Sequence, residues 1–346
     1  MAYTTINKST DYFNTKLYSG NYQSHAITGV GFQPDWVWIK ERSSTSSHRL
    51  MDAVRGVGKG LSSDNTTAEE SLAALLTSFD CDGFTVGADN GVNQNNQTYA
   101  AWNWKANGSG SSNSDGSVAS TVSANTTAGF SIVKWTGTGA TATVGHGLGV
   151  KPSMIIIKNT GAVENWVVYH GSLGAEKNIK LNNTEAQQDT TGAFNDTEPT
   201  SSVFTVHTNT NVNQSGQVMI AYCFAEKTGY SKFGSYTGNG NADGTFVYTG
   251  FKPSFVLVKR YSGTEQWQMT DSARDKDVSP NFARLNPDTT SAESTNTTWA
   301  KIEKFSNGFK LGGTDTVSNG SGDTYIYMCF AEAPLVGTNN VPCTAR

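Results

Sequence analysis

The stretch Gly31–Lys40, Gly-Phe-Gln-Pro-Asp-Trp-Val-Trp-Ile-Lys, returns twice in this chain. The later copies are Gly149–Lys158, Gly-Val-Lys-Pro-Ser-Met-Ile-Ile-Ile-Lys, and Gly250–Lys259, Gly-Phe-Lys-Pro-Ser-Phe-Val-Leu-Val-Lys. Proline cannot donate to a sheet ladder, so it suits the beginning of a strand, and the β-branched and aromatic run that follows predicts that strand. Successive side chains point to opposite faces, and both faces are apolar here. We therefore expect three central strands that are covered on both sides.

The segments around this stretch recur with it, so the repeat has the size of a domain. Each copy has an aromatic residue and a Gly turn before the central strand, and a further strand after it. The copies end in similar strands at Tyr99–Lys105, Met219–Glu226 and Tyr325–Glu332. Many short strands separated by turns are typical of sandwiches. We predict an all-β protein of three tandem homologous β-sandwich domains that resemble jelly rolls.

The predicted sandwich repeats occupy residues 1–106, 128–227 and 228–335. Residues 107–127 are rich in Ser, Gly, Asn and Thr; we expect a flexible linker over 107–116 and an added edge strand after it. Residues 336–346 form a C-terminal tail. Thr67–Thr77 is the one candidate helix.

Composition and charge exclude several classes of protein. The net charge of −4 provides no basic surface for nucleic acid. No apolar run approaches the roughly 18 residues of a membrane helix. The N-terminus lacks the features of a secretory signal, so we expect synthesis in a cytoplasm without export by that route.

The four cysteines do not suggest a disulfide scaffold or a zinc site, because no two have ligand spacing. Cys223 and Cys329 occupy the same position in two copies of the closing strand. We expect both to be buried free thiols that pack as small apolar groups. Cys81 lies in a predicted turn and Cys343 in the tail.

Two acidic residues are each followed by an arginine three positions later, at Asp52 and Arg55 and at Asp271 and Arg274. The second unit has His170 and Leu173 at these positions. Because the pair is absent from one unit, we interpret it as a local salt bridge or turn brace and not as an active site.

No other motif identifies a catalytic, cofactor or metal site. Asp80-Cys81-Asp82-Gly83 resembles the beginning of a calcium loop, but the downstream bidentate Glu is missing. The five histidines (His25, His48, His146, His170 and His207) show no pair with metal-ligand spacing. We therefore expect no catalytic residue, no cofactor and no metal. A carboxylate pair for sugar hydrolysis can assemble from distant loops without a local motif, so a glycan-cleaving enzyme stays open.

The tryptophans suggest either core packing or surface contacts with sugars and partners. Trp36, Trp38, Trp102 and Trp104 correspond to apolar positions of the other units, so we assign them to the core. Trp135, Trp166, Trp267 and Trp299 are the aromatic residues left open as platforms or anchors.

Several motifs together resemble a family of repeat proteins in marine bacteriophages. They include the opening Tyr3-Thr-Thr-Ile-Asn-Lys-Ser-Thr-Asp-Tyr-Phe, Ala101-Trp-Asn-Trp-Lys, His146-Gly-Leu-Gly-Val-Lys-Pro and the ending Asn340-Val-Pro-Cys-Thr-Ala-Arg. The resemblance runs the full length. Proteins of this kind are usually described as hypothetical, tail-fibre or other virion proteins, and no catalytic or ligand residues can be transferred from them.

The resemblance implies a non-enzymatic structural protein on the virion surface, released by lysis. We expect a tail fibre or receptor-binding protein that adheres to host-surface glycan, with a capsid decoration or head-fibre protein as the alternative. A tail-spike glycan hydrolase is the third hypothesis. The expected partners are other virion proteins and further copies of the chain, most simply a trimer.

Overall fold

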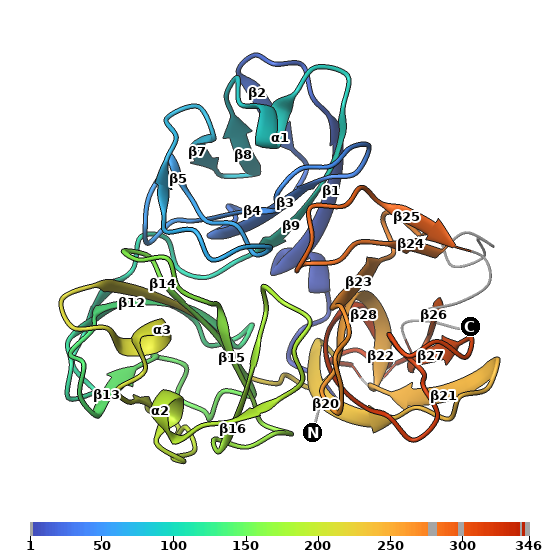
Figure 1. The fold of residues 1–346 in the computed structure, drawn as a ribbon. Helices are drawn as coiled ribbons and strands as arrows, with labels where there is room; N and C mark the ends of the chain where they lie inside the picture. The colour runs from blue at the N-terminus through green and yellow to red at the C-terminus, as the bar shows by residue number, and fades with distance from the viewer. Residues whose placement is uncertain (1–2, 276–281, 297–300, 340, 343–346) are drawn as a thin grey trace.

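The computed structural model describes residues 3–275, 282–296, 301–339 and 341–342. The chain is all-β, as predicted, and three lobes surround a common centre (Figure 1). Each lobe has one larger inner sheet, which faces this centre, and one smaller outer sheet. Unit 1, unit 2 and unit 3 name these lobes in chain order.

Unit 1 is a sandwich of two sheets, and the chain passes back and forth between them. Its inner sheet has the order β1 (Phe13–Ser19), β9 (Thr98–Trp104), β3 (Trp36–Glu41), β4 (Arg49–Asp52). Its outer sheet has the order β2 (His25–Thr28), β8 (Gly83–Val86), β7 (Leu76–Asp80). The remaining elements are the 3-10 helix η1 (Ser9–Asp11), the pair β5 (Lys59–Gly60) and β6 (Glu70–Ser71), and α1 (Asn90–Asn93).

Unit 2 repeats this order with additions at both edges of its inner sheet. The corresponding strands are β12 (Phe130–Thr136), β19 (Val218–Phe224), β14 (Met154–Asn159) and β15 (Val167–His170). The sheet is extended by β10 (Ser111–Asn113) and β11 (Ser120–Asn125) beside β12, and by β16 (Lys177–Lys180) and β17 (Gln188–Asp189) beyond β15. The outer sheet pairs β13 (Ala142–Gly145) with β18 (Val203–Val206), and the helices are α2 (Thr191–Phe194) and α3 (Thr210–Asn213).

Unit 3 has the same inner order: β20 (Ser231–Thr237), β28 (Thr324–Pro334), β22 (Phe251–Arg260), β23 (Gln268–Asp271). Its outer sheet is β21 (Asp243–Tyr248), β27 (Gly308–Gly312), β26 (Lys301–Phe305). A further hairpin pairs β24 (Phe282–Arg284) with β25 (Ser294–Asn296).

Two expectations about local structure change. The candidate helix Thr67–Thr77 is not helical; it contains β6 and the first residues of β7. The segment 107–127, expected to begin as a flexible linker, instead supplies β10 and β11, and β11 pairs with β12 in the position expected for the edge strand. A short polar segment can form a strand when it lies beside the open edge of a sheet. The composition of the segment does not show that such an edge is near, so it suggested a linker.

The central strands are buried on both faces, as predicted, and each face has a different partner. In β3, Val37 and Ile39 pack with residues of the outer sheet such as Phe84. Trp36 and Trp38 point the other way, into a core that all three units share. Every one of these side chains is fully buried.

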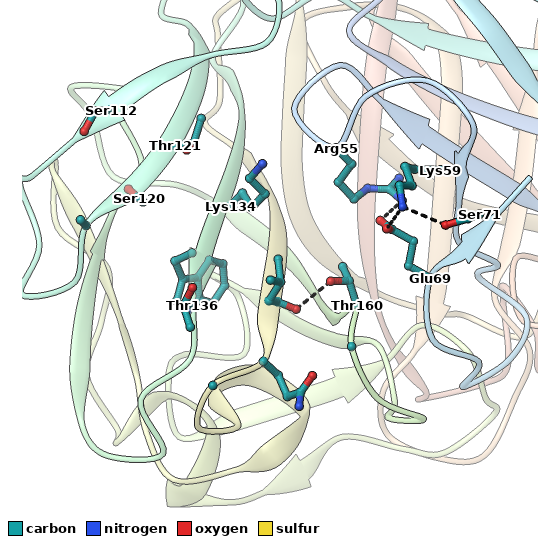
Figure 2. Close-up of a pocket in the computed structure, with 16 residues that line it drawn as sticks. Arg55, Lys59, Glu69, Ser71, Ser112, Ser120, Thr121, Lys134, Thr136 and Thr160 are labelled. Atoms are coloured by element: carbon teal, nitrogen blue, oxygen red, sulfur yellow. Dashed lines mark hydrogen bonds and ion pairs between the residues drawn. The ribbon is translucent and has the colours of Figure 1, made fainter. Parts of the chain in front are cut away.

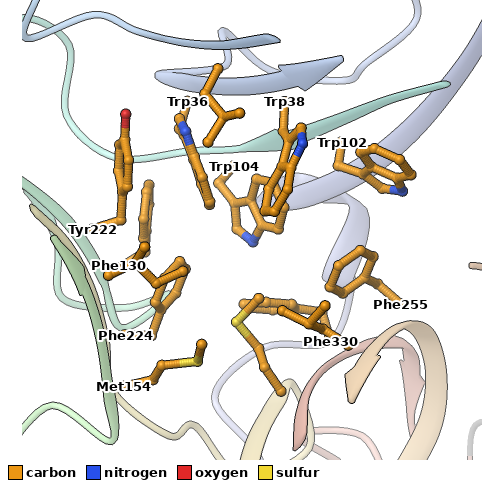
Figure 3. Close-up of a cluster of buried hydrophobic side chains, with 14 of the residues drawn as sticks. Trp36, Trp38, Trp102, Trp104, Phe130, Met154, Tyr222, Phe224, Phe255 and Phe330 are labelled. Atoms are coloured by element: carbon orange, nitrogen blue, oxygen red, sulfur yellow. The ribbon is translucent and has the colours of Figure 1, made fainter. Parts of the chain in front are cut away.

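This shared core, called the central core below, is rich in aromatic side chains (Figure 3). Trp36 of unit 1 stacks on Tyr222 of unit 2 with ring centroids 4.3 Å apart. Phe13 of unit 1 stacks on Phe330 of unit 3 at 5.1 Å. Offset and edge-to-face contacts of this kind add to the free energy gained by burying aromatic area. The central core therefore makes the three units one body.

A buried asparagine fixes the turn before the last inner strand of each unit. In unit 1 the Oδ1 of Asn93 accepts from the Asn21 N–H at 2.9 Å, and its Nδ2 donates to Gly87 O at 2.8 Å. Asn213 accepts from Thr138 N in unit 2, and Asn319 accepts from Asn239 N in unit 3. Each buried amide thus holds the backbone of a turn that precedes the outer sheet of its unit.

Candidate binding cleft

The three units meet at three joints, and each joint repeats one pair of backbone hydrogen bonds. A turn of one unit lies beside the tip that follows the central strand of the next unit. At the joint of units 1 and 2, Glu69 N donates to Thr160 O at 2.9 Å and Glu164 N donates to Thr66 O at 3.0 Å. The other joints have Gln187 N to Tyr261 O (3.1 Å), Glu265 N to Thr184 O (2.9 Å), Glu293 N to Arg42 O (2.8 Å) and Ser46 N to Thr290 O (2.9 Å). Since the last two bonds join unit 3 to unit 1, the ring is closed.

At each joint, the residue just before one strand of the inner sheet has a ring N–H that reaches back to the preceding unit. Trp166 Nε1 donates to Ser62 O, and Trp267 Nε1 donates to Lys180 O, both at 2.8 Å. The corresponding residue of unit 1 is His48, whose Nε2 lies 3.0 Å from Asn286 O in unit 3. Both tryptophans are therefore buried anchors between units and not surface platforms. Trp299 lies outside the described residues.

The predicted salt bridges are present, and each has a second role at a joint. Arg55 Nε lies 2.5 Å from Asp52 Oδ2, and Arg274 Nε lies 2.5 Å from Asp271 Oδ2. Asp52 also accepts from the Tyr222 hydroxyl of unit 2 at 2.8 Å. Burial acts to raise the pKa of Asp271, but Arg274 and the Trp102 indole hold it below its usual value.

Unit 2 replaces the aspartate at this position with a buried histidine. His170 Nδ1 accepts from Ser172 N–H at 3.2 Å, which leaves Nε2 as the protonated nitrogen facing Tyr327 O of unit 3, also at 3.2 Å. Burial lowers the pKa of His170 to about 4. Asp52, Asp271 and His170 thus each form a hydrogen bond to another unit and help to close the ring.

The remaining sequence candidates also have structural roles. Asp82 accepts from the N–H groups of Gly29 and Gly31, so the calcium-like segment braces a turn. Within the described ranges no group of three or more His, Cys, Asp or Glu is placed to hold a metal ion. Cys223 and Cys329 are buried free thiols, as predicted, and burial raises the pKa of each. Cys81 is exposed, and Cys343 lies outside the described residues.

A cleft of about 700 Å³ opens at the joint of units 1 and 2 (Figure 2). One wall comes from unit 1 and carries Arg55, Lys59, Glu69 and Ser71. The facing wall comes from β10, β11 and β12 of unit 2, with Thr160, Gly161, Gly216, Gln217 and Val218 at one end. The added strands β10 and β11 thus build one wall of this cleft.

The lining of the cleft is polar and cationic. Side-chain hydroxyl groups come from Ser71, Ser112, Ser120, Thr121, Thr136 and Thr160, and an amide comes from Gln217. Lys134 reaches across from unit 2 and donates to Val54 O of unit 1 at 3.1 Å. Trp135, one of the open aromatic candidates, also lines the cleft but is only 3% exposed, so it offers little surface for stacking.

The charges of the cleft do not balance. Arg55 is paired with the buried Asp52, and Lys59 lies 3.5 Å from Glu69. Lys134 forms no ion pair with a carboxylate among the contacts of the described residues, so it leaves one excess positive charge. Glu69 is the one carboxylate of the lining, and Arg55 and Lys59 already hold it. The cleft can therefore donate hydrogen bonds to a polar ligand, with a preference for anionic groups.

These features define the class of protein: a closed ring of three β-sandwich-like units with a preformed polar cleft at one joint. The chain belongs to the family described as DUF7483, a domain of unknown function, whose model matches residues 8–334. The match spans all three units, which agrees with their closure into one body. No curated protein and no solved structure matches this chain.

Proposed function

We propose that this chain is a structural protein of a bacteriophage virion, exposed on the particle surface, that binds host-surface glycan without cleaving it. The composition of the cleft carries the proposal for binding. Hydroxyl, amide and ammonium groups are the hydrogen-bonding partners that a sugar needs, and the joint holds them in place before the ligand arrives.

The same cleft argues against hydrolysis at this site. Glycosidases of the usual kind place two carboxyl groups on either side of the scissile bond. Glu69 is the single carboxylate of the described lining, and Arg55 and Lys59 already pair with it, so this cleft lacks the second carboxyl group. We therefore propose a binding protein and not a tail-spike hydrolase.

The phage assignment is supported by the resemblance of the sequence to virion proteins of marine bacteriophages. Within the described residues no helix is long and apolar enough to cross a membrane.

Three units with corresponding inner sheets already give each chain an approximate threefold arrangement (Figure 1). A further trimer of this ring would multiply the clefts, and avidity would then strengthen weak glycan contacts.

The lack of a fibre shaft in the described part of the chain favours a second candidate, a capsid decoration protein. The described α-helices are four residues long, so the described part of the chain builds no coiled coil. Such a protein would use its outer surfaces against other virion subunits.

Immunogold labelling of purified virions with an antibody against this chain tests both candidates. Label at the tail tip is expected for the adhesion protein, and label spread over the head is expected for the decoration protein. An unlabelled particle would contradict the proposed virion location altogether.

A further inference from the structure

The outer sheet of unit 3 exposes two large aromatic side chains beside each other on one strand. Phe246 is 45% exposed and Tyr248 is 55% exposed, whereas Val247 between them is 7% exposed. Because side chains alternate along a strand, Phe246 and Tyr248 share the outward face of β21. Neighbouring exposed aromatic residues on a soluble surface are typical of binding sites.

A third aromatic ring extends this surface across the sheet. Phe305 of β26 lies with its ring centroid 6.2 Å from that of Phe246, at an interplanar angle of 67°. Gly308 of β27 is in register with both Tyr248 and Phe305. A Cβ at Gly308 would lie 2.1 Å from Val247 O and 2.9 Å from Phe246 Cζ, so only glycine fits where β27 passes this close to β21 and the Phe246 ring. Phe246, Tyr248 and Phe305 are called the aromatic platform below.

Polar groups border a hollow of 510 Å³ beside Phe246 and Phe305. The hollow is lined by Asn307 and by the ion pair between Asp243 and Lys310. The platform therefore offers apolar ring faces next to a carboxylate, an ammonium group and an amide. A partner that matches it has an apolar face and hydroxyl groups at its rim.

Comparison of the three units shows that the fold does not require these rings. Val247, Ile27 and Val144 pair with equivalent phenylalanines of the neighbouring strand, which sets the correspondence. At the flanking positions unit 1 has Ala26 and Thr28, and unit 2 has Thr143 and Gly145. Unit 3 alone places aromatic residues at both flanking positions.

We propose that the aromatic platform is a second carbohydrate site, separate from the cleft, that stacks the apolar face of a pyranose ring. Hydroxyl groups at the sugar's edge would donate to Asp243 and accept from Lys310 and Asn307. This inference deepens the proposed glycan binding and rests on it, but it concerns different residues in a different unit.

Titration of the full chain with soluble oligosaccharides tests the site directly. The probes are tetrasaccharides of glucose, galactose, mannose and N-acetylglucosamine, and calorimetry measures their affinity. We expect Phe246→Ala and Tyr248→Ala each to weaken binding of the best probe at least tenfold, while Tyr248→Phe retains it. Tyr22→Ala is the matched control, because Tyr22 is an exposed aromatic residue of unit 1 (47% exposed), and it should leave the affinity unchanged.

Unchanged affinity in both alanine variants would overturn the platform while leaving glycan binding at the cleft intact. Absence of binding by every probe would also overturn the platform. The proposed virion location would be unaffected, because immunogold labelling tests it separately. A change in sedimentation of Phe246→Ala without any sugar effect would assign the surface to contacts between copies of the chain. Because the substituted residues are exposed, the unfolding midpoint of every variant should stay near that of the parent.

Discussion

Trp102 Nε1 donates to Asp271 Oδ2 at 2.9 Å, across 169 residues of sequence and between the first and third units. Asp271 is fully buried, and it also holds the guanidinium group of Arg274. One carboxylate thus closes the ring and neutralises a buried cation, which makes it a sensitive point of the fold.

Asp271→Ala should lower the free energy of unfolding by about 3–5 kcal/mol, because it leaves the Arg274 charge buried without its partner. Urea denaturation followed by tryptophan fluorescence measures the change. Asp243→Ala is the control: Asp243 is 87% exposed in its pair with Lys310, so the loss should stay below about 1 kcal/mol. Equal losses in the two variants would argue against the closing role of Asp271.

The stacked pair Trp36 and Tyr222 predicts that the units unfold together. Trp36→Ala should cost about 3–5 kcal/mol, because it opens a cavity in the central core that units 1 and 2 both line. Calorimetry of the full chain should show one transition, and the variant should shift that whole transition downward. A transition that splits, with only one part shifted, would show that the units are independent domains.

Two buried histidines predict acid sensitivity. His48 accepts from Trp38 Nε1 and His170 accepts from Ser172 N, so an added proton on either Nδ1 would face an N–H donor. Burial lowers the pKa of His170 to about 4 and that of His48 well below its usual value. The folded state therefore binds fewer protons than the unfolded state below pH 6.5, and stability is lost as the pH falls from there toward 4.

For His170 alone the expected loss is about 2 kcal/mol between pH 7 and pH 5. Urea denaturation at a series of pH values measures it. His170→Gln should be less stable at pH 7 but should show a shallower decline over this window. His207→Gln is the control, since His207 lies at an exposed hydrogen bond with Thr141, and it should keep the slope of the parent.

The repeated Gly-Pro-apolar pattern of the sequence predicts the central strands but not the elements that pack against them. Alternation along β3 predicts that Trp36 and Val37 face opposite sides, and both sides are buried. The pattern does not distinguish an outer sheet of the same unit from another unit, so the central core and the joints were not predicted. Trp36 contacts Tyr222 because the three units close into a ring. The residues near either position in the sequence do not predict this contact.

The site was harder to predict than the fold. The cleft combines β5, β6 and β12 with β10, which lies in the expected linker, and with β11, which lies in the expected edge strand, and no motif connects these pieces. The tryptophans do not lead to the aromatic platform, because Trp135, Trp166 and Trp267 are all buried, whereas the exposed rings belong to Phe246 and Tyr248. Comparison of alternating positions between units would have found them, since the other units have small or polar residues there.

Adhesion through the cleft is the central functional claim, and binding of the fluorescently labelled chain to host cells tests it most directly. The variant is Lys59→Gln with Lys134→Gln, which removes both lysine charges from the cleft lining. The control is Lys232→Gln, a partly exposed lysine of unit 3 that pairs with Glu226 at 3.1 Å. We predict saturable binding that weakens at least tenfold in the cleft variant, with the control unchanged and the unfolding midpoints similar. Equal binding by the cleft variant and its parent, or no binding by either, would contradict the claim.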